Sequence, residues 1–122
     1  MARYLWQSQV LTVGKFVNDY LQENKIILFA APTPADLALY CVVHRPDDLF
    51  QPISSGQKLK INGKDYTVTA VGEVANKNLQ VLGHITLSFD GAVHAELPGN
   101  IHLQGDAPDT ITPGDRISFY ET

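Results

Sequence analysis

Four histidines are the side chains of this sequence best suited to chemistry near neutral pH. His44 ends an apolar segment and is followed directly by Arg45 and Pro46. A proline cannot donate to a strand ladder, so we expect the strand to end here and the imidazole to emerge at its tip. A neutral imidazole attacks phosphorus without a metal and leaves again readily, which suits a reversible phosphoryl relay. His44 is therefore the candidate phosphoryl acceptor; the alternative is a structural histidine bonded to a backbone carbonyl.

The remaining histidines and the neighbouring arginine are weaker candidates. His84 is expected on the polar face of a strand, where it either supports His44 by donating a hydrogen bond to the phosphoryl group or simply faces solvent. His102 alternates with apolar neighbours in the same way, so we expect it to face solvent, and His94 is expected on the surface. Arg45 carries a suitable charge, but the alternation of a strand turns adjacent side chains to opposite faces.

Other chemistries find little support. His84, His94 and His102 raise the alternative of a metal site, but their spacing matches no compact ligand signature. Cys41 lies in an apolar segment without a cationic cluster, so an inert core thiol is expected. The glycines lack the spacing of a phosphate loop or a dinucleotide fingerprint. We expect no cofactor and no metal, and any phosphate must then arrive on another protein.

Length and composition limit the class of protein. With 122 residues, 44% of them hydrophobic, we expect one domain that spans 1–122. A net charge of −4 without a basic run argues against nucleic acid as a partner. No apolar stretch reaches the ~18–20 residues that span a bilayer, and we expect no membrane insertion. The N-terminus lacks the features of a signal peptide, and a single cysteine suits the reducing cytoplasm.

Short apolar runs, separated by nine glycines and seven prolines, predict a mostly β protein. The pair Asn62-Gly63 predicts a two-residue type I′ turn, which places Leu59 opposite Tyr66. The turn residues and the apolar alternation on either side agree, so the hairpin is predicted from independent signals.

Further strands are expected downstream. Residues 84–89 alternate between apolar and polar, and we expect them to pair with 93–97 through a loop that carries one extra residue. Segments 101–103 and 116–119 are predicted as short strands, the second of which closes the sheet. The fold class predicted is all-β, a compact closed or nearly closed barrel, with an open sandwich as the alternative.

Only one or two short helical turns are expected. Residues 15–21 carry apolar side chains on one helical face. Thr33 is the expected cap of a second turn that has Pro34 at its first helical position. This turn leads into the strand 40–44, which is apolar on both faces and is therefore expected in the middle of the sheet.

Several blocks along the chain carry a resemblance to one family. They are APTPADL at 31–37, YCVVH at 40–44, YTVTAVGEVA at 66–75, NL at 78–79, LGHITL at 82–87, FDG at 89–91, AELPG at 95–99 and ITPG at 111–114. In order and with little gap, they resemble the glucitol/sorbitol-specific IIA component of the bacterial phosphoenolpyruvate-dependent sugar phosphotransferase system (PTS). The resemblance covers most of the chain from about residue 27 onward.

The resemblance implies a β-barrel of unusual topology, a cytoplasmic location and a phosphohistidine at the position of His44. It implies HPr as the phosphoryl donor and the IIB/IIC permease components for a sugar alcohol, glucitol (sorbitol), as the acceptor. By family analogy the phosphate sits on Nε2, and no role follows for His84. The rival hypotheses are a non-catalytic β-barrel binding module and a metal-dependent barrel enzyme.

Overall fold

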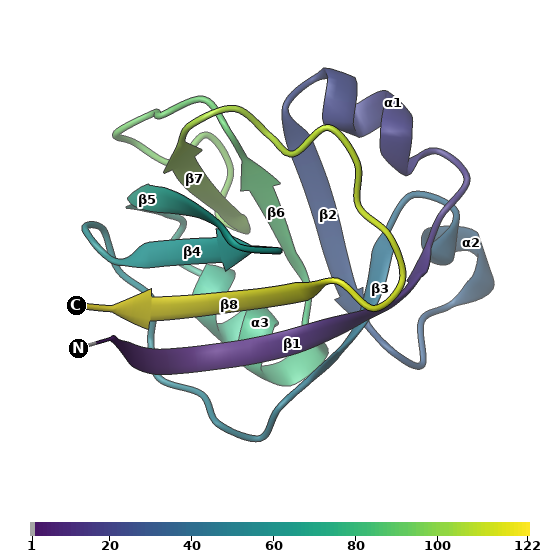
Figure 1. The fold of residues 1–122 in the computed structure, drawn as a ribbon, viewed down its shortest axis with the longest axis horizontal. Coiled ribbons are helices and arrows are strands. Elements are labelled where there is room, and N and C mark those ends of the chain that lie inside the picture. Colours follow the sequence, from purple (N-terminus) through teal and green to yellow (C-terminus); the bar gives the residue numbers. More distant parts are fainter. Residues whose placement is uncertain (1) are drawn as a thin grey trace.

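The structure is a computed structural model that describes residues 2–122. The strands are β1 (Arg3–Val13), β2 (Lys25–Ala30), β3 (Val42–Pro46), β4 (Lys58–Ile61), β5 (Lys64–Val71), β6 (Ile85–Ser88), β7 (Asn100–Gln104) and β8 (Arg116–Glu121). The helices are α1 (Val17–Gln22), α2 (Ala35–Ala38) and α3 (Ala75–Leu82). The strands close into a barrel in the order β1-β3-β2-β6-β7-β5-β4-β8, which confirms the predicted fold class (Figure 1).

Closure of the barrel depends on β1 and β8. β1 pairs with β3 on one side and with β8 on the other, and β8 also pairs with β4. The predicted closing strand at 116–119 is therefore confirmed. The barrel interior is filled by large apolar side chains that are at most 1% exposed, among them Trp6, Leu28, Leu59, Leu87, Ile101 and Phe119. Burial of such side chains contributes about 1.5–3 kcal/mol each, and this is the main force that holds the barrel together.

The hairpin predicted around residues 62–63 is confirmed. Leu59 lies opposite Tyr66 in the register of β4 and β5. Asn62 and Gly63 both have positive φ, 51° and 89°, as a type I′ turn requires. The strands of the hairpin are therefore twisted in the sense that lets them join the barrel.

The pairing predicted for 84–89 with 93–97 is wrong. β6 pairs with β2 and, in parallel, with β7. Residues 93–97 form no strand, and Val93 and Leu97 are 72% and 59% exposed. Their alternation gave a strand pattern without a buried face. Both edges of β6 are occupied by other strands, and β2 was not identified from the sequence.

The predicted helices and the central strand are mostly confirmed. α1 occupies the expected segment, and β3 lies in the middle of the sheet between β1 and β2. The cap predicted for α2 is wrong, because the Thr33 hydroxyl donates to the Ala30 carbonyl at 3.0 Å and Pro34 holds the N-cap position. The Thr33 hydroxyl lies within hydrogen-bond distance of the carbonyl groups of Phe29 and Ala30 at the end of β2. It therefore bonds back to β2, and α2 begins without a side-chain cap.

α3 was not predicted, and it gives the barrel a third helix. It buries Ala75 and Leu79 in the core and ends at Gly83, which has a left-handed conformation with φ 61°. Ala75 and Leu79 are buried but Val81 and Leu82 are exposed, so the apolar residues of this helix do not define one face in the sequence. Its position matters because it leads directly to His84 at the start of β6.

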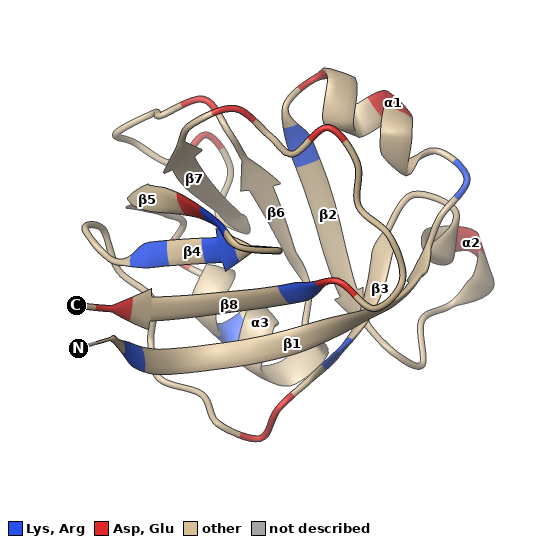
Figure 2. Ribbon diagram, viewed as in Figure 1, with Lys and Arg blue, Asp and Glu red and all other residues tan. Residues whose placement is uncertain are grey.

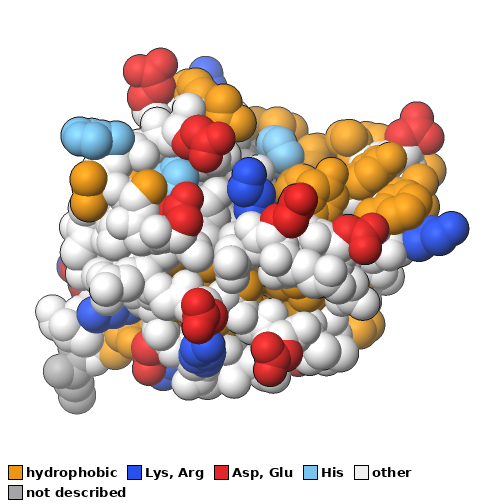
Figure 3. Space-filling view, turned by 90° about the horizontal axis from the view of Figure 1, so that it is seen from above, with side chains coloured by type: hydrophobic (Ala, Val, Ile, Leu, Met, Phe, Trp, Pro, Cys, Tyr) orange, Lys and Arg blue, Asp and Glu red, His pale blue; other side chains and the backbone are white. Residues whose placement is uncertain are grey.

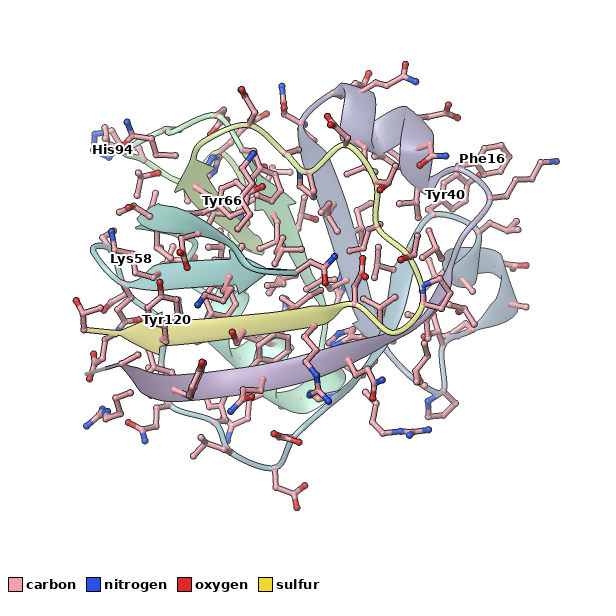
Figure 4. All side chains as sticks on the ribbon, viewed as in Figure 1. Phe16, Tyr40, Lys58, Tyr66, His94 and Tyr120 are labelled. Carbon is pink, nitrogen blue, oxygen red and sulfur yellow. The ribbon has the colours of Figure 1, made fainter. Side chains whose placement is uncertain are left out.

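Among residues 2–122 the Lys and Arg positions do not gather on one element. They are spread over β1, β2, β3, β4, β5, β8 and α3 and the loop before α1 (Figure 2). Hydrophobic side chains gather at the end of the molecule formed by α1 and α2 (Figure 3). There the ring of Phe16 stacks on Tyr40 with centroids 5.2 Å apart, which ties α1 to the segment after α2 (Figure 4). Within residues 2–122 the structure has no helix long and apolar enough to cross a membrane.

The start of α3 depends on a close backbone approach at Gly72. A Cβ at this position would collide with the carbonyl group of Pro98. We expect Gly72→Ala to lower the free energy of unfolding by about 1–3 kcal/mol, since backbone atoms cannot move aside as a side chain does. Urea denaturation measures this loss. The control is Gly99→Ala, whose Cβ would have no heavy atom nearer than 3.7 Å. Equal stability of the two variants would contradict the interpretation.

Candidate functional site

His44 lies on β3 with its side chain inside the barrel. The ring is 0% exposed, its Nδ1 is 2.6 Å from the Ser8 hydroxyl, and its Nε2 is 2.7 Å from the Gly83 carbonyl oxygen. The expectation of an exposed imidazole at a strand tip is therefore wrong. β3 continues to Pro46 and is covered on both edges, so the end of the strand does not coincide with the surface. Arg45 is exposed on the opposite face, as the alternation predicted.

The hydrogen bonds define the protonation of His44. A carbonyl oxygen can only accept, so Nε2 carries the proton and donates to Gly83. Burial lowers the pKa of His44 below its usual value, and this outweighs the opposite effect of the Gly83 hydrogen bond. The ring is therefore neutral at pH 7, and its unprotonated Nδ1 accepts the hydrogen bond of Ser8. His44 thus joins β1 and β3 to the turn between α3 and β6.

His84 follows Gly83 in that turn and is only half-buried. Its Nδ1 is 3.1 Å from the Leu28 carbonyl oxygen, so Nδ1 carries the proton and donates. Its ring packs against Phe29 with centroids 5.0 Å apart. In the neutral form of the ring the lone pair is then on Nε2, which makes no hydrogen bond with any of the described residues. His84 directly follows Gly83, the residue that His44 contacts, which is the neighbourhood that one of the two alternatives for His84 requires. His44 is buried where we expected it to be exposed, and His84 is half-buried.

Gly83 links the two histidines, and only glycine fits there. A Cβ would lie 2.5 Å from the Ala30 Cβ and 3.2 Å from the His44 Nε2, and φ is positive. The Gly83 N–H donates to the Leu79 carbonyl at 3.0 Å and so ends α3. The backbone that carries His84 is consequently fixed by the helix on one side and by His44 on the other. We call His44, Gly83 and His84, with Ser8, the two-histidine site.

His102 belongs to a separate cluster. The His102 side chain is 0% exposed, so the expectation that it faces solvent is wrong. Its Nδ1 donates to the Asp90 carboxylate at 2.8 Å, and its Nε2 accepts the Glu96 N–H at 3.1 Å. Burial tends to raise the pKa of Asp90, but the hydrogen bonds from His102 and the Ala92 N–H outweigh it and hold that pKa low. The cluster fastens the segment after β6 to β7. His94 is exposed, as predicted.

The cysteine is a core residue. Cys41 is 3% exposed, as expected for a core thiol, and burial raises the pKa of this thiol, which disfavours the reactive thiolate. Among residues 2–122, no group of three or more His, Cys, Asp and Glu side chains is arranged to hold a metal ion.

Sequence reasoning missed Ser8 and the structural role of Gly83. Ser8 lies on β1, a strand that the alternation pattern did not reveal. Gly83 had a signal, because a glycine after an apolar helical stretch is a common helix end. That signal depended on recognising α3 first.

The fold defines the class of protein. It is similar to the crystal structure of a PTS system IIA component from Enterococcus faecalis V583, with a TM-score of 0.81 and 32% sequence identity. The similarity covers 91% of this chain and 96% of that chain. The barrel is thus that of a PTS IIA component, a part of a phosphotransferase system.

The sequence specifies the family within this class. Residues 5–118 match the family described as PTS system glucitol/sorbitol-specific IIA component. The glucitol/sorbitol-specific EIIA components of Shigella flexneri and Escherichia coli (strain K12) are each 39% identical over 115 residues, which is 94% of this chain and 94% of each relative. The chain belongs to the glucitol/sorbitol-specific IIA family of the PTS, which confirms the resemblance.

The buried hydrogen bond from Ser8 should contribute measurably to stability. We expect Ser8→Ala to lower the free energy of unfolding by about 1–3 kcal/mol, because the His44 Nδ1 would remain buried without a donor. The matched control is Ser88→Ala, since the buried Ser88 hydroxyl has no hydrogen-bond partner within the described chain. Its removal should be neutral or slightly stabilising. Chemical denaturation measures the free energy of unfolding of both variants. A larger decrease for Ser88→Ala than for Ser8→Ala would contradict this interpretation.

The burial of His44 predicts a pH dependence. Its pKa in the folded protein lies below the ordinary histidine value of 6.5, so the unfolded chain binds more protons between the two values. The stability contributed by neutral His44 is therefore present above pH 6.5 and is lost as pH falls through the folded pKa. NMR titration of the ring measures this pKa, and His44→Gln should flatten the pH dependence of unfolding. Titration of His44 at or above 6.5 would contradict the interpretation.

Proposed function

We propose that this chain is a phosphocarrier of the cytoplasm. It accepts a phosphoryl group from phospho-HPr on a histidine of the two-histidine site and passes it to the IIB component of a sugar-alcohol permease, for uptake of glucitol (sorbitol). Membership of the glucitol/sorbitol-specific IIA family supports the pathway. The single observation that carries the chemistry is the half-buried, hydrogen-bond-oriented imidazole of His84 beside His44.

The acceptor that the family resemblance implies is His44, and the resemblance gives no role to His84. For His44 to accept the group at Nε2, that nitrogen must release its proton, and the Gly83 carbonyl must leave its place 2.7 Å away. This assignment therefore includes an opening of the turn between α3 and β6 before transfer.

The surroundings of the site suit a protein partner. Val81 and Leu82, the last residues of α3, are 69% and 46% exposed and directly precede the turn that carries His84. Exposed apolar side chains next to a reactive group favour a transient interface and exclude water from a labile phosphoramidate. Phosphoryl transfer has a loose transition state, so alignment of donor and acceptor rings supplies most of the catalysis.

Phosphorylation by the general PTS proteins tests the proposed function. After incubation with phosphoenolpyruvate, enzyme I and HPr, we expect a mass gain of ~80 Da on a single histidine, stable in alkali and labile in acid. Omission of HPr is the control and should prevent the gain. A chain that stays unmodified in the complete mixture is a non-catalytic barrel, and the proposed function is then wrong.

A further inference from the structure

We propose that Ser8 is a positioning residue for phosphoryl transfer to His44. Its hydroxyl changes from donor to acceptor toward the Nδ1 of His44, and this change frees the lone pair of Nε2 while the ring keeps its place. The proposal rests on the proposed function, with His44 as the acceptor at Nε2, and it gives a role in the reaction to a residue outside the two imidazoles.

The structure holds His44 in the tautomer that cannot attack through Nε2. That nitrogen carries the proton that it donates to the Gly83 carbonyl, and the lone pair is on Nδ1, which accepts from the Ser8 hydroxyl at 2.6 Å. A nucleophilic nitrogen needs its lone pair. Transfer to Nε2 therefore requires the proton on Nδ1, and the partner of Nδ1 must then accept a hydrogen bond where it now donates one.

A hydroxyl group meets this requirement without moving its oxygen. It has one hydrogen and two lone pairs, so rotation about the C–O bond converts it from a donor into an acceptor. A carboxylate at position 8 could only accept, and an ammonium group could only donate. The contact between Ser8 and Nδ1 thus allows both tautomers of the His44 ring with the same placement of the heavy atoms.

The hydrogen bond to Ser8 lies on the side of the ring that stays fixed during transfer. The Gly83 carbonyl must leave Nε2, whereas Ser8 lies on β1, which pairs with both β3 and β8. Trp6, also buried on β1, meets the His44 ring edge-on with centroids 5.6 Å apart. β1 therefore keeps the direction of the imidazole when the turn between α3 and β6 opens, and this alignment is what the transfer needs.

The transfer step balances with one exchange of protons with water. When the turn opens, water takes the proton from Nε2 and supplies one to Nδ1, so the ring of His44 stays neutral. The Nε2 lone pair then forms a bond to phosphorus while the phosphorus–nitrogen bond of the donor's phosphohistidine breaks. That electron pair returns to the donor nitrogen, and the donor ring, protonated on its other nitrogen, leaves as neutral imidazole.

The phosphorylated His44 keeps its proton on Nδ1 and is a phosphoimidazolium. The Ser8 oxygen accepts a hydrogen bond from this charged N–H, and a charge-assisted hydrogen bond is stronger than a neutral one. Ser8 thus stabilises the product of the transfer as well as the attacking tautomer.

Three variants test the role of the hydroxyl. Ser8→Ala removes both the donor and the acceptor at Nδ1. Ser8→Thr retains the hydroxyl, and a β-branched side chain is well suited to a strand. Ser88→Ala is the matched control, because Ser88 is also buried on a strand but its hydroxyl has no hydrogen-bond partner within the described chain. Urea denaturation identifies conditions in which each variant is folded, and the rates are measured there.

The first measurement is the rate of phosphate uptake as a function of phospho-HPr concentration. We expect Ser8→Ala to lower the maximal rate about 10- to 100-fold, because the ring is misaligned, with little change in the concentration that gives half of that rate. Ser8→Thr should recover most of the rate, and Ser88→Ala should react like the unaltered chain. A folded Ser8→Ala that reacts at the unaltered rate, or a folded Ser8→Thr as slow as Ser8→Ala, overturns the proposal.

The second measurement is NMR of the phosphorylated protein labelled with nitrogen-15. In the unaltered chain we expect a proton on the Nδ1 of His44 that exchanges slowly with water, and faster exchange of this proton in Ser8→Ala. A phosphorylated His44 without a proton on Nδ1 overturns the proposal and leaves the proposed function standing. An unaltered chain that takes up no phosphate overturns the proposed function itself, so the two failures are distinguishable.

Discussion

The structure depends on one buried imidazole whose two nitrogens must both be satisfied. His44 lies within the barrel, and a buried polar group without a partner costs about 1–3 kcal/mol. Ser8 supplies the donor and Gly83 the acceptor, from segments far apart in the sequence. This requirement brings β1, β3 and the turn after α3 to one place. It also explains the glycine at position 83, since any Cβ there would displace the Ala30 side chain or the ring.

The histidines differ in burial and in their hydrogen bonds, and these differences separate structural rings from the ring at the surface of the site. His44 and His102 are completely buried and hydrogen-bonded at both nitrogens, and each fastens a connecting segment to the barrel. His84 lies at the boundary between core and solvent, with one nitrogen held by β2 and the other available. The barrel thus holds both imidazoles of the two-histidine site through backbone carbonyl groups, those of Gly83 and Leu28. Transfer through His44 then requires that the turn between α3 and β6 opens.

The sequence predicted those features that local signals determine. The hairpin at 62–63 was predictable because turn chemistry and alternation coincide, and β3 because an apolar run on both faces requires a central position. The pairing of 93–97 was wrong because alternation is ambiguous without knowledge of β2. The exposure of His44 was misjudged because Pro46 shows where the strand ends, whereas burial depends on the side chain's inward direction and on β1. The contact with Ser8 joins residues 36 apart, and no local pattern reveals it.

The most direct test of this account is the nitrogen to which phosphorus is bonded. In the protein labelled with nitrogen-15 and phosphorylated through HPr, NMR can detect the coupling between phosphorus and a ring nitrogen and identify the residue. The account predicts coupling to the Nε2 of His44, which requires that this nitrogen has released its hydrogen bond to the Gly83 carbonyl. Coupling to a nitrogen of His94 or His102, which lie outside the two-histidine site, would contradict it.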